Sequence, residues 1–165
     1  MRRSVVALVA AGAAAVATGC SAPQPPEVTF YTDGDSVTAP PLSYCDALLK
    51  DCDTDGEPVS LDARPGRPVQ ISLPAEIAET PWLVIVQSAA PDGTLLPMRQ
   101  EVFTDGTRHA YTVVPESPGH QPLVVEVQQL GAAYAVDDSD KPIVDERGEP
   151  QLVVRGVWSL QIEPV

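Results

Sequence analysis

The chain has 165 residues, of which 23 are acidic and 10 are basic, so its formal net charge at pH 7 is −13. A chain this acidic offers no basic patch to replace the counterions of a nucleic acid, and the same charge works against an electrostatic grip on anionic lipid heads. Its length suits one domain with a real core, and its 18 prolines argue against long helices and for short strands joined by turns.

Residues 1–19 have the pattern of a lipoprotein signal peptide. Two arginines give a positive start, residues 5–17 form a short apolar run, and Ala17-Thr18-Gly19-Cys20 matches a lipobox, a small-residue cleavage site that ends on the cysteine to be lipidated. The run is too short to cross a membrane, which takes about 20 apolar residues. We therefore expect export, cleavage before Cys20 and acylation of its thiol. The alternative is an ordinary secretory signal with a cysteine there by chance.

The expected mature chain begins at Cys20 and is held at the outer face of the cytoplasmic membrane. It loses both arginines of the signal, so its formal charge becomes 8 − 23 = −15, and the anchor has to come from the acyl chains. One chain holds only marginally, which favours a multiply acylated cysteine. Residues 20–26 are the lipidated cysteine and a proline-rich, semi-rigid tether. Residues 27–165 are expected to form a single domain.

The domain has the pattern of a β protein. Alternating apolar and polar residues, and short runs of β-branched and aromatic residues, predict strands near 28–31, 69–73, 82–86, 102–103, 109–114, 123–128 and 152–162. Asp105-Gly106 predicts a hairpin between the strands on either side of it. In the last strand Trp158, Leu160 and Ile162 share one face, so Trp158, like Trp82, is expected in the core. Residues 43–50 are expected to form one or two helical turns.

These elements predict an all-β fold. Frequent short strands without repeated helices indicate an antiparallel β-sandwich of immunoglobulin-like architecture, with a short helical or loop insertion near a disulfide. That disulfide is expected between Cys45 and Cys52, an even pair in an exported chain. Closing so small a loop stabilises the fold by roughly 2 to 3 kcal/mol in the loop-entropy model. A zinc or redox site is the alternative, but it needs more ligands or a tighter spacing.

Several of these residues together resemble a known family. Cys45, Cys52, Leu73-Pro74, Pro81-Trp82 and Gly156-Val157-Trp158-Ser159 are similar to an actinobacterial family of exported lipoproteins that carry a domain of unknown function. The resemblance covers most of the mature chain, and its motifs are structural. It implies an envelope lipoprotein and supplies no catalytic residues.

One acidic segment matches the start of a calcium-binding loop. Asp51, Asp53 and Asp55 occupy loop positions 1, 3 and 5, a glycine follows at position 6, and Asp62 falls at position 12. Two departures weaken the match, because aspartate replaces the longer glutamate at position 12 and a proline stands at position 8. We therefore expect a solvated acidic turn and no cofactor, with a calcium site on these four aspartates as the alternative.

The other polar candidates are weaker. A second acidic cluster is expected to be a solvated loop; it comprises Asp137, Asp138, Asp140, Asp145 and Glu146. A triad of Ser117, His120 and an aspartate can be written, and His109 is placed in a strand. No nucleophile-elbow motif surrounds the serine, so we expect no catalysis from this set.

The sequence therefore predicts a non-enzymatic envelope lipoprotein that presents a surface to an envelope protein or a wall polymer. The alternative is an extracytoplasmic module that binds calcium or a small ligand between its sheets, and a hydrolase is the last choice. An exposed apolar patch would favour the first function. An apolar pocket with convergent polar groups would favour the second.

Overall fold

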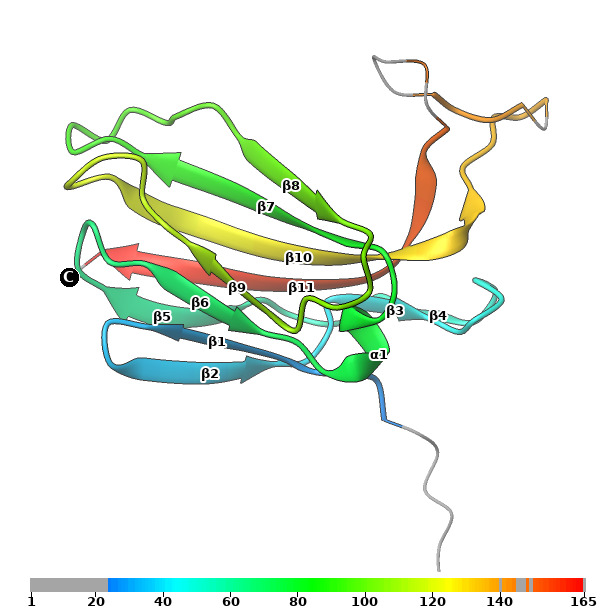
Figure 1. The fold of residues 1–165 in the computed structure, drawn as a ribbon, viewed down its shortest axis with the longest axis horizontal. Helices are drawn as coiled ribbons and strands as arrows, with labels where there is room; N and C mark the ends of the chain where they lie inside the picture. The colour runs from blue at the N-terminus through cyan, green and yellow to red at the C-terminus, as the bar shows by residue number, and fades with distance from the viewer. Residues whose placement is uncertain (1–23, 140, 145–147, 149, 165) are drawn as a thin grey trace, which may run out of the picture.

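The computed structural model describes residues 24–139, 141–144, 148 and 150–164, and it confirms the predicted antiparallel β-sandwich (Figure 1). The smaller sheet has the order β2 (Asp35–Ala39), β1 (Val28–Thr32), β6 (Val69–Ser72) and β9 (Ala110–Val113). The larger sheet has the order β4 (Cys52–Asp53), β3 (Ser43–Cys45), β11 (Leu152–Pro164), β10 (Gln121–Tyr134), β7 (Trp82–Ala89) and β8 (Arg99–Phe103). The strand β5 (Val59–Ala63) adds one parallel pair beside β11.

The core lies between the two sheets and is built from the alternation that the sequence predicts. Val69 and Ile71 of β6 are buried while Gln70 and Ser72 are exposed, because successive side chains of a strand point to opposite faces. Trp82 stacks on Phe103 with ring centroids 4.1 Å apart. Trp158 is fully buried, as predicted, and both tryptophans are core residues.

A buried glutamine joins the larger sheet to the one short helix described, α1 (Ala75–Ala78). Gln129 of β10 is fully buried, and its Nε2 donates to the Glu76 carbonyl oxygen at 2.7 Å and to Thr80 Oγ1 at 2.9 Å. A buried amide needs such partners, since leaving it unpaired costs about 1 to 3 kcal/mol. In the part of the chain that the structure describes, no helix is long and apolar enough to span a membrane.

The predicted hairpin at Asp105-Gly106 is wrong. The turn itself forms, with the Thr107 N–H donating to Asp105 Oδ1 at 3.0 Å and Gly106 at φ +67°. However, β8 pairs with β7 in the larger sheet, while β9 pairs with β6 in the smaller one. The turn therefore crosses between the sheets, because Phe103 at its start is held in the core by Trp82.

The predicted helical turns at residues 43–50 are also wrong, and the loop alternative is correct. Residues 43–45 form β3, which pairs with β11 on one side and with β4 on the other. Cys45 and Cys52 are directly opposite in this short hairpin. Pairing on both sides satisfies the backbone of β3 as a strand, so the local tendency towards helix does not decide the structure.

Candidate functional site

The predicted lipidation site, Cys20, and the predicted signal peptide lie outside the described residues. The described chain begins at Gln24, where the tether meets the domain. The Trp158 indole Nε1 donates to the Pro26 carbonyl oxygen at 2.9 Å, which ties the end of the tether to the core. The end of the tether is therefore bonded to a core residue in the middle of the larger sheet.

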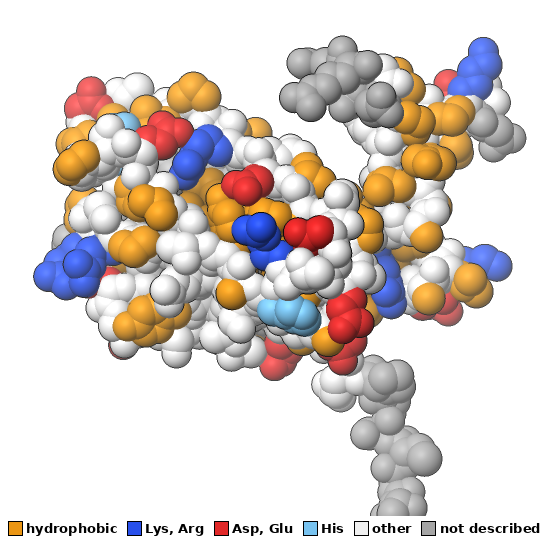
Figure 2. Space-filling model, viewed as in Figure 1, with side chains coloured by type: hydrophobic (Ala, Val, Ile, Leu, Met, Phe, Trp, Pro, Cys, Tyr) orange, Lys and Arg blue, Asp and Glu red, His pale blue; other side chains and the backbone are white. Residues whose placement is uncertain are grey.

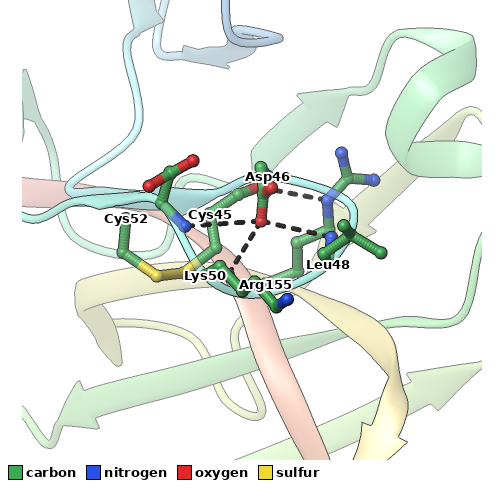
Figure 3. Close-up of a disulfide and its surroundings, with 7 residues drawn as sticks. Cys45, Asp46, Leu48, Lys50, Cys52 and Arg155 are labelled. Carbon is green, nitrogen blue, oxygen red and sulfur yellow. Dashed lines mark hydrogen bonds between the residues drawn. A yellow bond between two sulfur atoms is a disulfide. The ribbon is translucent and has the colours of Figure 1, made fainter.

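The predicted disulfide is confirmed and closes a loop beside the tether (Figure 3). Inside that loop one Asp46 oxygen, Oδ1, accepts the backbone N–H of Leu48 at 3.1 Å and of Lys50 at 2.8 Å. These bonds, that of Lys50 first, lower the pKa of the Asp46 carboxyl. Leu49 has a φ of +57°, which is unusual for a bulky residue. The loop is thus held in one conformation by a covalent bond and a carboxylate.

An open groove of about 690 Å³ runs between this loop and the tether. Its lining includes Gln24 and Pro25 of the tether, Lys50 and Cys52 of the disulfide loop, and Arg155 of β11. The Arg155 guanidinium lies over the Tyr44 ring, 5.1 Å from its centroid, and its Nε donates to the Cys45 carbonyl oxygen at 3.3 Å. The tether, the disulfide loop and β11 therefore meet at one end of the sandwich.

The four aspartates of the calcium-loop motif do not come together. The Asp53 carboxylate accepts the Asp55 N–H at 3.1 Å in a local turn, whereas Asp62 lies on β5, opposite Glu163 of β11. Within the described residues no three side chains of His, Cys, Asp or Glu are placed to hold a metal ion together.

The glycine of that motif has a different role. A Cβ at Gly56 would lie 2.2 Å from the Pro41 carbonyl oxygen, so the residue permits close packing on the chain at 41–42. The chain then runs extended into β5 and does not turn back around an ion.

The histidines and Ser117 do not form a catalytic arrangement among the described residues. His109 is exposed and precedes β9, so its predicted place inside a strand is wrong by one residue. His120 meets Ser117 only through the backbone, where its N–H donates to the serine carbonyl oxygen at 3.1 Å. The His120 Nδ1 atom is buried and has no hydrogen-bond partner in the described part of the molecule. Sequence reasoning listed the residues for a triad, and the fold does not assemble them.

A small pocket opens at the sandwich edge, where β8 and β9 belong to different sheets. It has about 250 Å³, an apolar floor that includes Val84 and Val113, and a polar mouth. The Tyr111 hydroxyl donates to Glu101 Oε2 at 2.5 Å, and burial together with this carboxylate raises the pKa of Tyr111 to about 12. Arg99 pairs with Glu116, in the loop after β9, at 3.3 Å. Tyr111, Glu101 and Arg99 at the pocket mouth thus already have polar partners, and the charges of β8 protect an edge strand.

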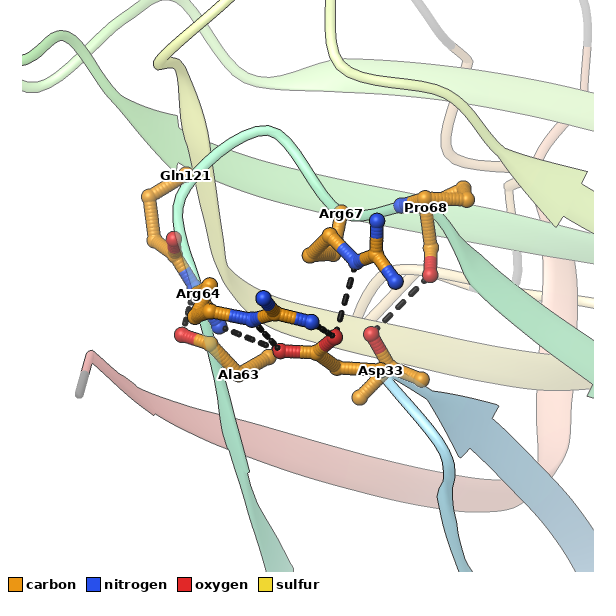
Figure 4. A network of polar contacts seen from close by, with 7 residues as sticks. Asp33, Ala63, Arg64, Arg67, Pro68 and Gln121 are labelled. Carbon is orange, nitrogen blue, oxygen red and sulfur yellow. Dashed lines mark hydrogen bonds and ion pairs between the residues drawn. The ribbon is translucent and has the colours of Figure 1, made fainter.

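The opposite end of the sandwich from the tether is closed by an ion-pair network (Figure 4). Asp33 has a side chain only 8% exposed, and its Oδ1 lies 2.5 Å from Arg64 Nη2 and 2.8 Å from Arg67 Nε. The hydrogen bonds from the side chain and the backbone of Arg64 hold the pKa of Asp33 well below its usual range. Both arginines are occupied by one carboxylate, which is typical of a structural clamp between the β1–β2 and β5–β6 turns.

The ribbon, defined here as the described residues from 130 to 154, projects from the sandwich beyond its paired strands (Figure 1). In its stem, Leu130 is opposite Val154 and Tyr134 is opposite Leu152, so β10 carries extra residues there. Such a bulge bends a strand. Leu49 of the disulfide loop packs against the base of the ribbon, with its Cδ1 3.2 Å from where a Cβ on Gly131 would lie.

Past the stem, three segments of the ribbon meet at a junction. The Ala135 N–H donates to the Gln151 carbonyl oxygen at 2.7 Å. The Gln151 N–H donates to the Ile143 carbonyl oxygen at 2.8 Å, and the Ile143 N–H donates to the Ala135 carbonyl oxygen at 2.8 Å. Two isolated β-bridges adjoin this closed triangle of hydrogen bonds, one between Val136 and Pro142 and the other between Val144 and Pro150. The backbone is thus satisfied at the junction while its side chains face solvent.

Four large apolar side chains around the junction are exposed, and we call them the ribbon patch. They are Tyr134 (56% exposed), Val136 (50%), Ile143 (42%) and Val144 (51%). Figure 2 shows apolar side chains in orange on this projection at the upper right. The sequence predicts a solvated acidic loop here. Of its acidic cluster, Asp137 and Asp138 are exposed, while Asp140, Asp145 and Glu146 lie outside the described residues. The missed signal was the apolar residues between the acidic ones.

The comparisons with known proteins identify a family but no activity. The family model described as "Protein of unknown function (DUF2771)" matches residues 21–163. The chain is 30% identical over 156 residues to "Uncharacterized protein Rv0875c" of Mycobacterium tuberculosis, an alignment that covers 93% of this chain and 88% of that protein. It is similar to the same extent to "Uncharacterized protein Mb0899c" of Mycobacterium bovis. No solved structure matches.

Proposed function

Because this chain belongs to the DUF2771 family of proteins of unknown function, we propose its role from its own surface: it is a non-enzymatic, lipid-anchored module of the cell envelope that binds another protein through the ribbon patch. Acyl chains on Cys20 hold it at the outer face of the cytoplasmic membrane. The disulfide supports an extracytoplasmic compartment, since such bonds persist where the environment is oxidising.

The observation that carries this proposal is the exposure of the ribbon patch on a projecting two-stranded element. A two-stranded ribbon is marginally stable in water on its own, because it has no second layer to bury its apolar face. Here four large apolar side chains of such an element are 42 to 56% exposed. Exposed apolar groups that lie together mark interaction sites in soluble domains. A partner that covers the patch would supply the missing layer.

The base of the ribbon supports the same role. Leu49 of the disulfide loop packs beside Gly131 at the point where the ribbon leaves the sandwich, and the Arg155 side chain is bonded to Cys45 on the neighbouring strand. The loop therefore braces the ribbon at its root. A braced element loses less conformational freedom when it binds, and this lowers the cost of association.

Photocrosslinking in cells tests the proposal. A photoreactive amino acid is placed at Val144 in the full chain, and the matched control carries it at Val102 of β8, which is 49% exposed but outside the ribbon. The expected result is one discrete protein adduct from position 144 and none from position 102. No adduct from position 144, or the same adducts from both positions, would contradict the proposal. In parallel, Cys20→Ala should abolish labelling by a fatty-acid probe, and persistent label would refute the anchor.

A second candidate function, the binding of a small ligand, has one supporting observation. The pocket at the sandwich edge combines a valine floor with the Tyr111–Glu101 pair. Its volume of about 250 Å³ lies below the usual range of roughly 300 to 1,000 Å³ for ligand sites, and a ligand would have to break the hydrogen bond at the mouth. We therefore place this function second.

A further inference from the structure

We infer that the partner surface which covers the ribbon patch is basic and belongs to a protein that lies close to the membrane. This inference rests on the proposed function and adds the chemistry of the partner. It follows from the charges that surround the patch, and from the place where the tether joins the domain.

The ribbon patch is flanked by carboxylates that are held in position. Asp137 follows Val136 directly, and its Oδ1 accepts the N–H of Ser139 at 2.8 Å and of Lys141 at 3.1 Å, so its turn is fixed. Asp137 and Asp138 are both exposed. In the sequence, residues 137–149 contain six acidic and two basic residues. A partner that buries the patch has to meet the exposed carboxylates of Asp137 and Asp138, and complementary charge at the rim of an interface speeds association and selects the partner.

The same charges argue against the two other ways of covering the patch. Insertion into a bilayer would take the carboxylates beside the patch out of water, and an ionised carboxylate is costly to desolvate. Pairing with a second copy would place like charges opposite each other, in a mature chain whose formal charge is 8 − 23 = −15. A basic protein surface has neither penalty.

The tether places this partner near the membrane. Gln24 is four residue steps along the chain from Cys20, and an extended chain of that length spans at most about 14 Å. Gln24 and Pro25 line the groove together with Arg155 and Cys52, and Arg155 directly follows Val154 at the ribbon's base. With Cys20 anchored, the root of the ribbon lies within a short distance of the lipid surface. The partner must therefore be accessible within the distance from the membrane that the tether and the ribbon together allow.

The experiment uses the photoreactive chain with the probe at Val144 in native membranes and follows the adduct. The test variant is Asp137→Asn with Asp138→Asn, which removes two charges but keeps the amide oxygen that can fix the turn. The matched control is Asp92→Asn with Asp105→Asn, because those residues accept the N–H of Thr94 and Thr107 in the same kind of turn, each at 3.0 Å. A second variant, Asp138→Lys, reverses one charge. Thermal melts establish that each variant is folded.

The expected result is a protein adduct whose yield falls about threefold or more in the double asparagine variant, and falls further in Asp138→Lys. The yield should also fall at about 0.5 M salt, where charges are screened within a few ångströms. The control should keep its yield, and mass spectrometry should map the adduct to a basic segment of another envelope protein. A yield unchanged by charge and salt would overturn this inference and leave the proposed function standing. Adducts with lipid alone, or with a second copy, would overturn both.

Discussion

Replacing Trp158 by alanine tests the packing that supports both the core and the tether. The side chain is fully buried and its Nε1 donates to the Pro26 carbonyl oxygen at 2.9 Å. Truncating a buried tryptophan costs about 3 to 5 kcal/mol, of which roughly 1 kcal/mol is the lost hydrogen bond. For a domain of this size each kcal/mol lowers Tm by about 2 to 4 °C. We therefore expect a decrease in Tm of roughly 6 to 20 °C.

The measurements are thermal and urea unfolding of residues 21–165, followed by circular dichroism, with Trp158→Phe as the control. Phenylalanine keeps much of the ring contact but cannot donate to Pro26, so it should cost much less than alanine, about 1 to 2 kcal/mol. An alanine variant that loses less than about 1 kcal/mol would refute the reasoning, because a buried aromatic side chain cannot be removed so cheaply.

Four further predictions concern single features. Cys45 and Cys52 should both resist alkylation in the denatured, non-reduced mature protein, and stoichiometric labelling would show that the bond is absent. Gly156→Ala should cost about 1 to 3 kcal/mol of unfolding free energy, because the new Cβ would lie 2.6 Å from Trp158 Cη2; the cost should be smaller in the Trp158→Phe background, which lacks that atom. Asp33→Asn should be less stable than the native chain at neutral pH. The pKa of Asp33 is lowered in the folded state from its usual 3.8. The difference in stability between the two proteins should therefore persist as the pH falls to about 3.8, and it should shrink below that pH. A difference that already vanishes above pH 3.8 would contradict the ion-pair network. Millimolar calcium should change Tm by no more than about 1 °C. A true calcium site would stabilise the fold by roughly 2.7 kcal/mol when calcium is a hundredfold above its dissociation constant. A calcium-specific increase in Tm that Asp53→Ala abolishes would restore the metal site.

The sequence by itself determined the features that depend on neighbouring residues. Apolar and polar residues alternate around Val69–Ile71 and Trp158–Leu160, and this pattern predicts that the apolar side chains face the core. The sequence suffices for this prediction because the two-residue period of a strand depends only on neighbouring residues. The disulfide was predictable because the sequence predicts lipidation of Cys20, which leaves only Cys45 and Cys52 to pair. Of the surface that we propose as the binding site, the sequence showed the carboxylates but not the role of the apolar residues between them.

Only the tertiary structure decided which strands pair and where segments meet. The Asp105-Gly106 turn has hairpin chemistry, yet it joins two sheets, because Phe103 packs under Trp82 and β9 pairs with β6. Gly56 fits a calcium loop in sequence but serves close packing on the Pro41 carbonyl. The exposure of the ribbon patch also depends on distant contacts. β7 pairs with β10, and β3 pairs with β11, only up to the base of the ribbon. Pairing between segments far apart in the chain is set by competition among long-range contacts, and no local pattern of residues encodes its outcome.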